Sequence, residues 1–324
     1  MANQTHINVN TAQLNDLFLL LVKIPNTEIN HLSQVLHLNA NAIHRLITEL
    51  NQMGLDISVR ENKVNLSNPI DTLDIDLLAS ILKENHINKP LSYYFASDST
   101  NHIARKESST GLYISDYQCS GKGRRQKKWL TPLAQSIALS ISHDFNFSLQ
   151  QLTGLNIAIG VAIINTSNYF NCKNLGLKWP NDVLRDKEKI AGILIEASGN
   201  TQKCRAIIGI GLNWNIRHEL LDSINQKCGN IDIHNTNRTE FLAQLIIEVE
   251  NIIKEFSING LTHILPHWQS KDLFVGQTVN IIQDQDICQV KYLGVNSDGS
   301  LQVKTSDQLK TIASGEVSIK LSKI

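Results

Sequence analysis

Apolar side chains in the first 54 residues recur every three or four positions, which is the spacing of helices that bury one face. The pattern predicts three helices. Because asparagine is a good helix N-cap, the second helix is expected to start after Asn26 and the third after Asn39, and Gly54 is expected to end the third. The apolar positions that define the stripes are Leu14, Leu17, Phe18, Leu21, Ile29, Leu32, Val35, Leu36, Ile43, Leu46, Ile47 and Leu50.

After Gly54 the period changes from helical to the two-residue alternation of strands. Leu55–Val59 and Lys63–Leu66 alternate apolar and polar residues on either side of Glu61-Asn62. This alternation predicts a hairpin directly after the helices. Three helices followed by a hairpin predict a winged helix-turn-helix over residues 1–66.

Residues 67–270 mix helical and strand signals and are expected to form the main body of the protein. A helix is expected from Arg238 to Glu255, and the clearest strands are expected at Leu175–Trp179, Lys189–Glu196 and Ala206–Asn213. The remaining residues contain only short alternating segments around a turn at Asn296–Gly299, which predicts a small all-β module. We therefore expect an α+β protein of three domains, with the boundaries 1–66, 67–270 and 271–324.

Composition narrows the class of protein only a little. The 324 residues contain 30 Lys and Arg and 30 Asp and Glu, so the formal net charge is zero and any electrostatic attraction must be local. The five cysteines are odd in number and lack C-x-x-C spacing, which argues against a disulfide framework or a zinc site. The best apolar run, Leu17–Val22, is far too short to span a membrane, and the N-terminus lacks the features of a signal peptide. We expect a cytoplasmic protein with no membrane anchor and no metal site built from its own side chains.

The most unusual segment is the basic loop, residues 117–129, with the sequence YQCSGKGRRQKKW. Five cations lie within seven residues, among two glycines that let the backbone come close to a ligand. Phosphate recognition uses both features, backbone N–H groups and guanidinium forks. The loop is neither a Walker P-loop nor a dinucleotide fingerprint, because Gln126 takes the place of a third glycine. A solvated basic loop or a non-specific nucleic-acid patch would have the same sequence features, so the segment alone leaves these alternatives open.

Two expected strands carry further candidate groups. In Leu175–Trp179 the alternation places Lys178 on the same face as Gly176, which is costly on a buried strand unless an anion meets the lysine; an exposed edge strand would remove that cost. In Ala206–Asn213 two glycines share a face with the terminal asparagine, which suggests that something flat packs there, with close packing against a helix as the alternative. The run Asp98–Asn101 could cap a helix or bind a polar ligand.

Together and in this order, these segments resemble those of the biotin–protein ligase family, and most closely the bifunctional ligases that also repress biotin-synthesis genes. The resemblance covers nearly the whole chain and rests on three signatures, Lys178–Asp182 (KWPND), Lys189–Glu196 (KIAGILIE) and Gly209–Asn213 (GIGLN). It implies an N-terminal winged helix-turn-helix, a central mixed sheet like that of class II aminoacyl-tRNA synthetases, and a C-terminal SH3-like β-barrel.

The resemblance also implies a two-step reaction. The biotin carboxylate attacks ATP and gives biotinyl-adenylate and pyrophosphate, and a lysine amine of a biotin carboxyl carrier protein domain then attacks the adenylate. Such catalysis reduces to positioning and to neutralising anions as they approach. Mg²⁺ is expected to accompany ATP, held largely by phosphates and water. The adenylate-bound form is expected to be a homodimer.

Position by position, the resemblance assigns roles to individual residues. The implied catalytic residues are Arg124, in the loop that closes over biotin and phosphate, and Lys178, as the cation on the biotin carboxylate and the adenylate phosphate. The implied biotin contacts are Ser99, Thr100, Asn101, Gln118, Lys122, Gly123, Arg124 and Lys178. The implied ATP and adenylate contacts are Arg124, Trp129, Lys178 and Asn213.

The basic loop departs from the family pattern at two positions. The family loop usually reads Gly-Arg-Gly-Arg-Arg-Gly, whereas this chain has Lys122 and Gln126 in place of an arginine and the last glycine. Lysine keeps the charge but loses the bidentate fork, and glutamine stiffens the loop. We expect weaker retention of the adenylate, with the chemistry intact.

DNA binding and lipoate ligation are the rival functions. The third helix would present Asn41, His44, Arg45 and Thr48 to the major groove. Yet residues 1–66 hold four Lys and Arg against five Asp and Glu, a net charge of −1, whereas DNA-binding domains usually carry a basic face. Operator binding and a vestigial N-terminal domain both remain open. A lipoate–protein ligase shares the fold, but the winged helix, the C-terminal module and Lys178–Asp182 favour biotin.

Overall fold

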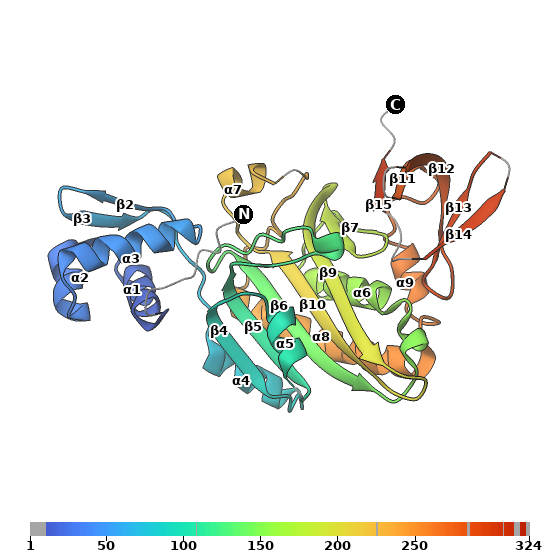
Figure 1. Cartoon of the computed structure of the whole chain (residues 1–324), viewed down its shortest axis with the longest axis horizontal. Helices are drawn as coiled ribbons and strands as arrows, with labels where there is room; N and C mark the ends of the chain where they lie inside the picture. The colour runs from blue at the N-terminus through green and yellow to red at the C-terminus, as the bar shows by residue number, and fades with distance from the viewer. Residues whose placement is uncertain are drawn as a thin grey trace.

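The computed structural model describes residues 11–107, 109–224, 226–283, 286–306, 308–313 and 318–321, so residues 1–10 and 322–324, at the outer ends of the chain, lie outside the described residues. Three parts follow one another along the long axis of the molecule (Figure 1). A small unit of helices and short strands stands at one end, a large sheet with helices fills the centre, and a second sheet stands at the other end. Within the described residues, no helix is long and apolar enough to cross a membrane.

The N-terminal unit contains three helices, as the apolar stripes predicted, together with a three-stranded sheet. Its helices are α1 (Thr11–Lys23), α2 (Ile29–Leu36) and α3 (Ala40–Gln52), and its strands are β1 (Asn26–Glu28), β2 (Ile57–Arg60) and β3 (Lys63–Leu66), in the order β1-β3-β2. Their buried apolar residues form one core. Asn39 caps α3 as expected, because its side-chain oxygen accepts a hydrogen bond from the Ala42 amide at 2.9 Å.

The predicted start of the second helix is wrong. Residues Asn26–Glu28 form strand β1, which pairs with Lys63–Asn65 of β3, and α2 begins only at Ile29. The N-cap residue of α2 is Glu28, which makes no side-chain capping hydrogen bond. The backbone of Asn26 therefore pairs in the sheet with Asn65, 39 residues away in the chain. A local capping rule does not detect such a contact.

The central sheet has seven strands in the order β4-β5-β6-β10-β9-β8-β7, and only the β4–β5 pair is parallel. The strands are β4 (Leu91–Ser97), β5 (Gly111–Gln118), β6 (Ser136–Phe145), β7 (Leu175–Lys178), β8 (Asp182–Arg185), β9 (Glu188–Gly199) and β10 (Cys204–Asn213). The three strands expected from sequence are thus present, with β9 and β10 slightly longer than predicted.

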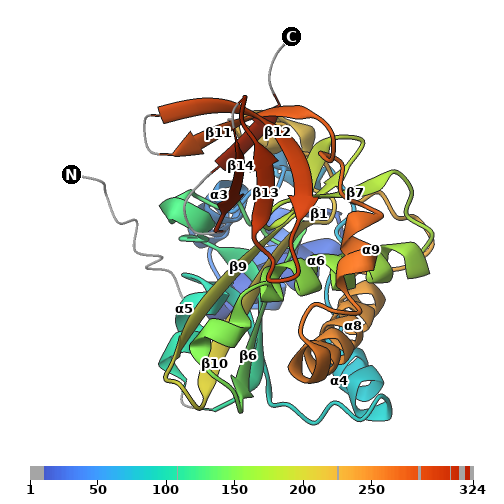
Figure 2. The same cartoon turned by 90° about the vertical axis from the view of Figure 1, so that its right-hand side faces the viewer.

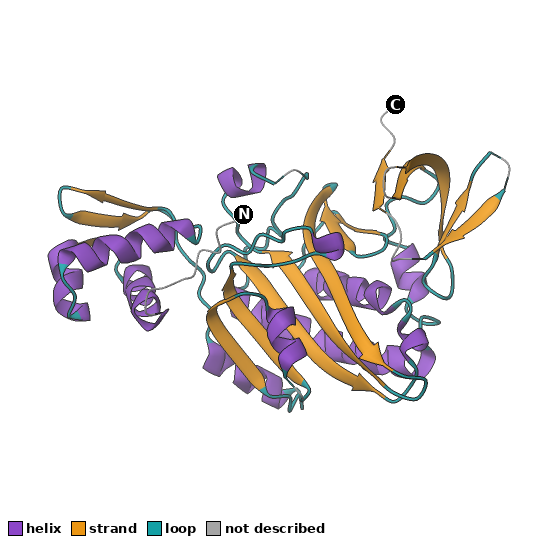
Figure 3. Ribbon diagram, viewed as in Figure 1, coloured by secondary structure: helices purple, strands orange, loops and turns teal. Residues whose placement is uncertain are grey.

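Helices cover the two faces of this sheet unequally. Helices α4 (Ile75–Glu84), α6 (Leu155–Tyr169) and α8 (Arg238–Asn259) lie on one face, and the short α5 (Thr100–Lys106) lies on the other (Figures 1 and 3). The first face is the main hydrophobic core, which α6 and α8 share with every strand from β5 to β10. Two shorter helices, α7 (His218–Asp222) and α9 (Leu265–Gln269), complete the body. The second face, beside α5, is only partly covered by helix and is where polar residues gather.

The C-terminal part is a five-stranded antiparallel sheet in the order β14-β13-β12-β11-β15. Its strands are β11 (Thr278–Gln283), β12 (Asp286–Val295), β13 (Leu301–Lys304), β14 (Leu309–Ile312) and β15 (Ser318–Leu321). The alternation did not predict β14. The sheet stands beside α9 at one end of the molecule (Figure 2), and its buried residues join the main core. The Trp179 indole donates a hydrogen bond to the Gly299 carbonyl at 3.0 Å and so fixes the β12–β13 turn to the body.

The N-terminal unit is also joined to the central body by specific contacts. Phe95, Leu133 and Ala134 of the body pack into its core. The Leu133 amide donates to the Met53 carbonyl at 2.9 Å, and the Gln135 side chain donates to the Gly54 carbonyl at 2.8 Å. The end of α3 therefore sits directly on the segment that follows the basic loop.

Candidate active site

The partly covered face of the central sheet has a floor of small residues. The strand register places Lys178, Asp182, Gly192, Gly211, Ala138 and Ser115 in one row across β7, β8, β9, β10, β6 and β5. Because alternate residues of a strand share a face, a second row lies two residues further on, with Leu194, Gly209 and Ser140. Opposite charges thus stand at one end of the first row, and glycines form its middle.

Both interpretations of the glycine strand are correct, each for one glycine. A Cβ at Gly211 would lie 2.3 Å from the Trp129 indole, so the flat group that packs there is the protein's own tryptophan. A Cβ at Gly209 would lie 2.3 Å from the side-chain oxygen of Asn101, so this glycine admits helix α5. A Cβ at Gly192 would lie 3.0 Å from Cζ3 of the same indole. Any side chain at these positions would displace a candidate ligand-binding residue.

Thr100 and Gln118 meet at the α5 end of the floor. The Gln118 carbonyl oxygen accepts from the Thr100 amide at 2.8 Å, and its amide nitrogen donates to the Thr131 hydroxyl at 2.9 Å. The Ser140 hydroxyl lies 2.7 Å from that of Thr100. Ser99, buried, is the N-cap residue of α5 without a capping hydrogen bond from its side chain. These contacts fix which way the amide of Gln118 points.

Asn101 makes three hydrogen-bond contacts within the protein. Its nitrogen donates to the Glu196 carboxylate at 2.9 Å and to the Leu194 carbonyl at 3.4 Å, and its oxygen lies 2.6 Å from the Ser140 hydroxyl. Both amide hydrogens are therefore used within the protein. Asn101 therefore ties helix α5 to β9 and β6 at the edge of the floor.

The basic loop folds back on itself and closes over the floor. Its two arms pair at Lys122 and Lys128, the Gly123 amide donates to the Lys127 carbonyl at 2.7 Å, and the Trp129 amide donates to the Gly121 carbonyl at 2.8 Å. A Cβ at Gly121 would lie 2.6 Å from the Trp129 carbonyl, so this close approach requires glycine. The hairpin therefore carries the indole of Trp129 onto Gly211.

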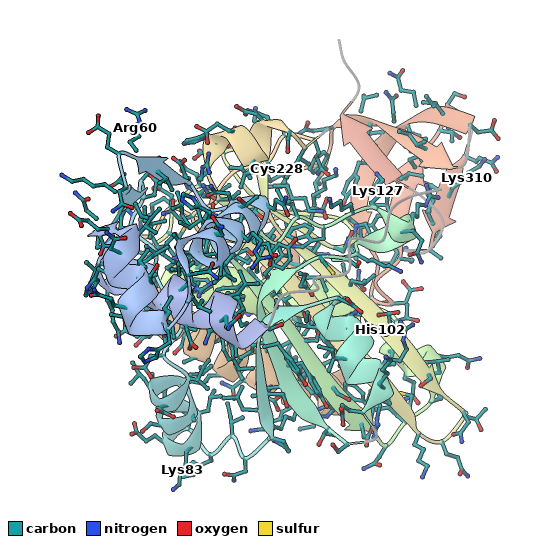
Figure 4. The ribbon with its side chains drawn as sticks, turned by 60° about the vertical axis from the view of Figure 1, so that its left-hand side comes forward. Arg60, Lys83, His102, Lys127, Cys228 and Lys310 are labelled. Carbon is teal, nitrogen blue, oxygen red and sulfur yellow. The ribbon has the colours of Figure 1, made fainter. Side chains whose placement is uncertain are left out.

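The tip of the basic loop is strained, and only part of it turns inward. Arg125 and Gln126 both adopt left-handed backbone conformations, with φ of 54° and 57°, where glycine is favoured. Arg124 turns inward and donates to the Asn181 side chain at 3.2 Å, whereas Lys122, Lys127 and Lys128 are exposed. Burial lowers the pKa of the Arg124 guanidinium, and nearby Asp182 acts in the opposite direction. Figure 4 shows Lys127 on the side of the molecule that carries the C-terminal sheet.

The cation that the sequence interpretation missed is Lys189. Its Nζ lies 5.2 Å from the centre of the Trp129 ring and 2.7 Å from an oxygen of Asp182, so it points over the glycine floor. Lys178, the predicted cation, lies at the outer end of the row, 3.9 Å from the other oxygen of Asp182 and 5.9 Å from the ring centre of Phe274. Lys189 stood inside a quoted signature, but strand alternation gave no reason to single it out.

Asn213 lies at the edge of the floor and is buried. Its side-chain nitrogen donates to the Gly229 carbonyl at 2.9 Å and lies 3.4 Å from the Lys189 carbonyl. It therefore holds the segment around Gly229 against the start of β9. The Cys228 thiol lies in that segment, and burial raises its pKa. None of the five cysteines, all of them in described segments, forms a disulfide.

The predicted DNA contacts lie outside this site. Asn41, His44, Arg45 and Thr48 are exposed on α3 of the N-terminal unit. The turn of the hairpin β2–β3 contacts the start of α2, where the Ile29 amide donates to the Asn62 carbonyl at 2.9 Å. Arg60 of this hairpin stands at the far side of the molecule from Lys310 of the C-terminal sheet (Figure 4). The described segments contain no group of three or more His, Cys, Asp and Glu that could hold a metal ion.

Two family models match the chain. Residues 94–213, which include the floor and the basic loop, match the Biotin/lipoate A/B protein ligase family, and residues 274–320 match the Biotin protein ligase C terminal domain. The "Bifunctional ligase/repressor BirA" of Salmonella typhimurium is 28% identical over 300 residues, covering 89% of this chain and 92% of that protein, and the protein of the same name from Escherichia coli is 27% identical over the same length.

Solved structures agree on the fold. The biotin protein ligase from Aquifex aeolicus in complex with biotin and ATP superposes with a TM-score of 0.62 at 24% identity, covering 72% of this chain and all of that one. The family match over residues 94–213 places the central domain among the biotin and lipoate ligases. The match to the C-terminal domain then selects the branch, and the chain belongs to the biotin–protein ligase family.

Proposed function

We propose that this protein activates biotin with ATP to give biotinyl-adenylate and pyrophosphate, and then transfers biotin to a lysine of a biotin carboxyl carrier protein domain. The observation that carries the proposal is the glycine floor with a polar pocket at one end and inward-facing cations at the other. The match to the biotin-specific C-terminal domain favours biotin over lipoate. Reduced cysteines and the nature of the carrier substrate favour a cytoplasmic location.

The polar pocket suits the ring end of biotin. Thr100, Gln118 and Ser140 supply donors and acceptors that are fixed by their mutual hydrogen bonds, so little ordering is needed when a ureido group binds. The remaining hydrogen of the Gln118 amide and the hydroxyl of the buried Ser99 are the candidate contacts. The fused ring would lie along the floor, where Ala138 and the glycines leave room.

The cationic end suits the reacting groups. The first step joins a carboxylate oxygen to the α-phosphorus and breaks the bond to pyrophosphate, so two anions must come together. Lys189 and Arg124 point toward the floor from β9 and from the basic loop, and would neutralise the carboxylate and the phosphate as they approach. Trp129 would pack against the nucleotide side of the adenylate. In the second step a neutral amine attacks the acyl carbon and AMP leaves, so no nucleophilic side chain of the protein takes part.

Mg²⁺ is expected to enter with ATP. The described residues offer no acidic cluster for it, so the phosphates and water would supply most of its ligands. The ion would add positive charge to the α-phosphate region, while Lys189 and Arg124 orient the carboxylate. The protein's own contribution is therefore the position of two cations and the exclusion of water by the basic loop.

Pyrophosphate release tests the proposal. The full-length protein with ATP and Mg²⁺ should release pyrophosphate with biotin and not with lipoate, and should then label a carrier domain on its acceptor lysine. Release with lipoate alone would replace the proposal by lipoate ligation. Release with biotin but without transfer to any carrier domain would limit the activity to the first step.

We infer a second function, repression by operator binding, from the N-terminal unit. Its helices α2 and α3 and hairpin β2–β3 have the order of a winged helix-turn-helix, and the exposed face of α3 carries side chains that can read base edges. The names of the Salmonella and Escherichia relatives couple ligation with repression. The boundaries 1–66, 67–270 and 271–324 and an SH3-like form of the C-terminal sheet complete the proposed architecture.

Operator binding would require a homodimer, since operators recognised by helix-turn-helix proteins have two half-sites. On the side facing β8, strand β9 is paired only up to Gly192 among the described ladders, so its continuation to Gly199 offers an edge for a second copy. A gel shift with the DNA upstream of the biotin genes should show binding only with biotin and ATP. Absence of binding under all conditions would mean a vestigial N-terminal unit.

A further inference from the structure

One carboxylate lies between the cations of the site. Asp182 pairs across the sheet with Lys178 on β7 and with Gly192 on β9. Its two oxygens contact different lysines, Lys189 at 2.7 Å and Lys178 at 3.9 Å. The three side chains are 14–20% exposed, so the contacts are only partly screened by water. Arg124, held on neighbouring Asn181, is near enough for its charge to interact with that of Asp182.

This carboxylate fixes Lys189 where a ligand would meet it. A lysine on a four-carbon stem has many rotamers, and ordering it costs conformational entropy. The short contact with Asp182 and the indole of Trp129 together hold its Nζ over the floor. A phosphate that binds there finds the cation already in place.

The same carboxylate also opposes the anion that binds. Asp182 shares the floor row with Gly192, so a phosphate near Lys189 lies close to a second negative charge. That charge weakens the hold of the cations on every anionic ligand, including the adenylate. A ligase that must give up its intermediate to a carrier domain benefits from such a limit.

We infer that Asp182 is a positioning residue that holds Lys189 in place and, through its charge, limits how tightly the adenylate is retained. The inference rests on the proposed function, and it gives this chain a second determinant of adenylate retention beside the basic loop. Two other roles are open to the same carboxylate, a structural ion pair of the β7–β8 hairpin and a ligand of Mg²⁺, and substitution of Asp182 distinguishes them.

Two substitutions separate the effect of the negative charge of Asp182 from its effect on the position of Lys189. Asp182→Asn keeps an oxygen that can accept from Lys189 but removes the negative charge, whereas Asp182→Ala removes both. Asp186→Asn is the matched control, because Asp186 lies in the turn after β8, is exposed, and pairs with Arg185 at 3.7 Å, away from the floor. For each variant we would measure pyrophosphate release, the dissociation rate of preformed adenylate, and the melting temperature.

Asp182→Asn should form the adenylate faster than Asp182→Ala and release it roughly three- to tenfold more slowly than the native protein, as expected for the loss of one nearby charge at intermediate dielectric. Asp182→Ala should form the adenylate more slowly, because Lys189 is no longer placed. Asp186→Asn should behave as the native protein. A purely structural ion pair would give faster release and a lower melting temperature in Asp182→Asn.

Three results would overturn the inference. The first is unchanged or faster adenylate release by Asp182→Asn, and the second is equal rates of adenylate formation in the Asn and Ala variants. The third is a loss of adenylate formation in Asp182→Asn that raised Mg²⁺ restores, which would make Asp182 a metal ligand. If the native protein releases no pyrophosphate with biotin and ATP, the proposed function itself fails and the inference fails with it.

Discussion

The contact between Trp129 and Gly211 gives the sharpest test of the site. In Gly211→Ala the new Cβ would lie 2.3 Å from the indole, whereas ordinary contact begins at 3.4 Å, so the ring must lift by about 1 Å. The ring sits at the end of a closed hairpin, tied by the bond from the Trp129 amide to the Gly121 carbonyl, and the whole loop must follow. Overpacking of this size costs about 1–3 kcal/mol.

We expect much of that cost to fall on nucleotide binding, because the indole is only partly buried and can move without opening the core. The value of kcat/KM for ATP should fall by roughly tenfold or more, since 1.4 kcal/mol corresponds to a factor of ten. The KM for biotin should change little. Pyrophosphate release at varied ATP and fixed biotin measures the first effect, and the converse titration measures the second.

Matched glycine variants supply the controls. Gly192→Ala meets the same indole at 3.0 Å and should have a smaller effect of the same kind. Gly209→Ala meets Asn101 at 2.3 Å and should raise the KM for biotin instead. In a double-mutant cycle, Gly211→Ala should add little to Trp129→Ala, because the ring it displaces is absent. An unchanged KM and kcat for ATP in Gly211→Ala would refute the assignment of Trp129 to the nucleotide.

Three further predictions concern the basic loop and the core. Lys122→Arg/Gln126→Gly should slow adenylate dissociation, because glycine relieves a left-handed strain of about 1 kcal/mol at φ 57° and arginine restores a bidentate fork; equal dissociation rates would contradict this. Arg124→Gly should release the adenylate and label lysines of bystander proteins, visible on a streptavidin blot, and labelling confined to carrier domains would show that Arg124 does not retain it. Burial, together with the charge of Lys89, lowers the pKa of His143 in the folded state. At pH values below the ordinary histidine pKa, unfolding is therefore accompanied by uptake of a proton, and the free energy of unfolding should fall as the pH drops from about 7.5 to about 5.5. Urea midpoints should show a smaller drop in His143→Gln than in the native protein.

Much of the architecture follows from local pattern. The stripes of α1 and α3 and the alternation of β3, β9 and β10 recur in the structure close to where the sequence places them, because the period of apolar residues reports which face is buried. The start of α2 and strand β14 were not found. The start of α2 depends on pairing of Asn26 with β3, 39 residues away in the chain, and no local rule detects such a partner. Strand β14 pairs with its neighbour β13 across the short connection 305–308, and the apolar alternation there was too weak to predict it.

The sequence predicted which segments form the candidate site better than it predicted how their side chains are arranged. The sequence singled out the basic loop, the glycine strand and the run from Ser99 to Asn101, and the structure brings all three to one face of the central sheet. It could not rank Lys178 against Lys189. Both stand near glycines in quoted signatures, and the register places Lys178 in the floor row. Only the side-chain contacts reveal that Lys189 also reaches over the floor, beside Trp129 and Gly192, while the Nζ of Lys178 lies toward Phe274.

The sequence by itself determined the kind of chemistry, since clustered cations, paired glycines and short hydroxyls are properties of residue type and spacing. The tertiary structure decided which of these groups a ligand can meet. The side-chain amides of Asn101 and Asn213 look available for a ligand in the sequence. In the structure they donate hydrogen bonds to the Glu196 carboxylate and the Gly229 carbonyl. The physical reason is that a buried polar group must find a partner, and which partner it finds depends on strands that lie far apart in the chain.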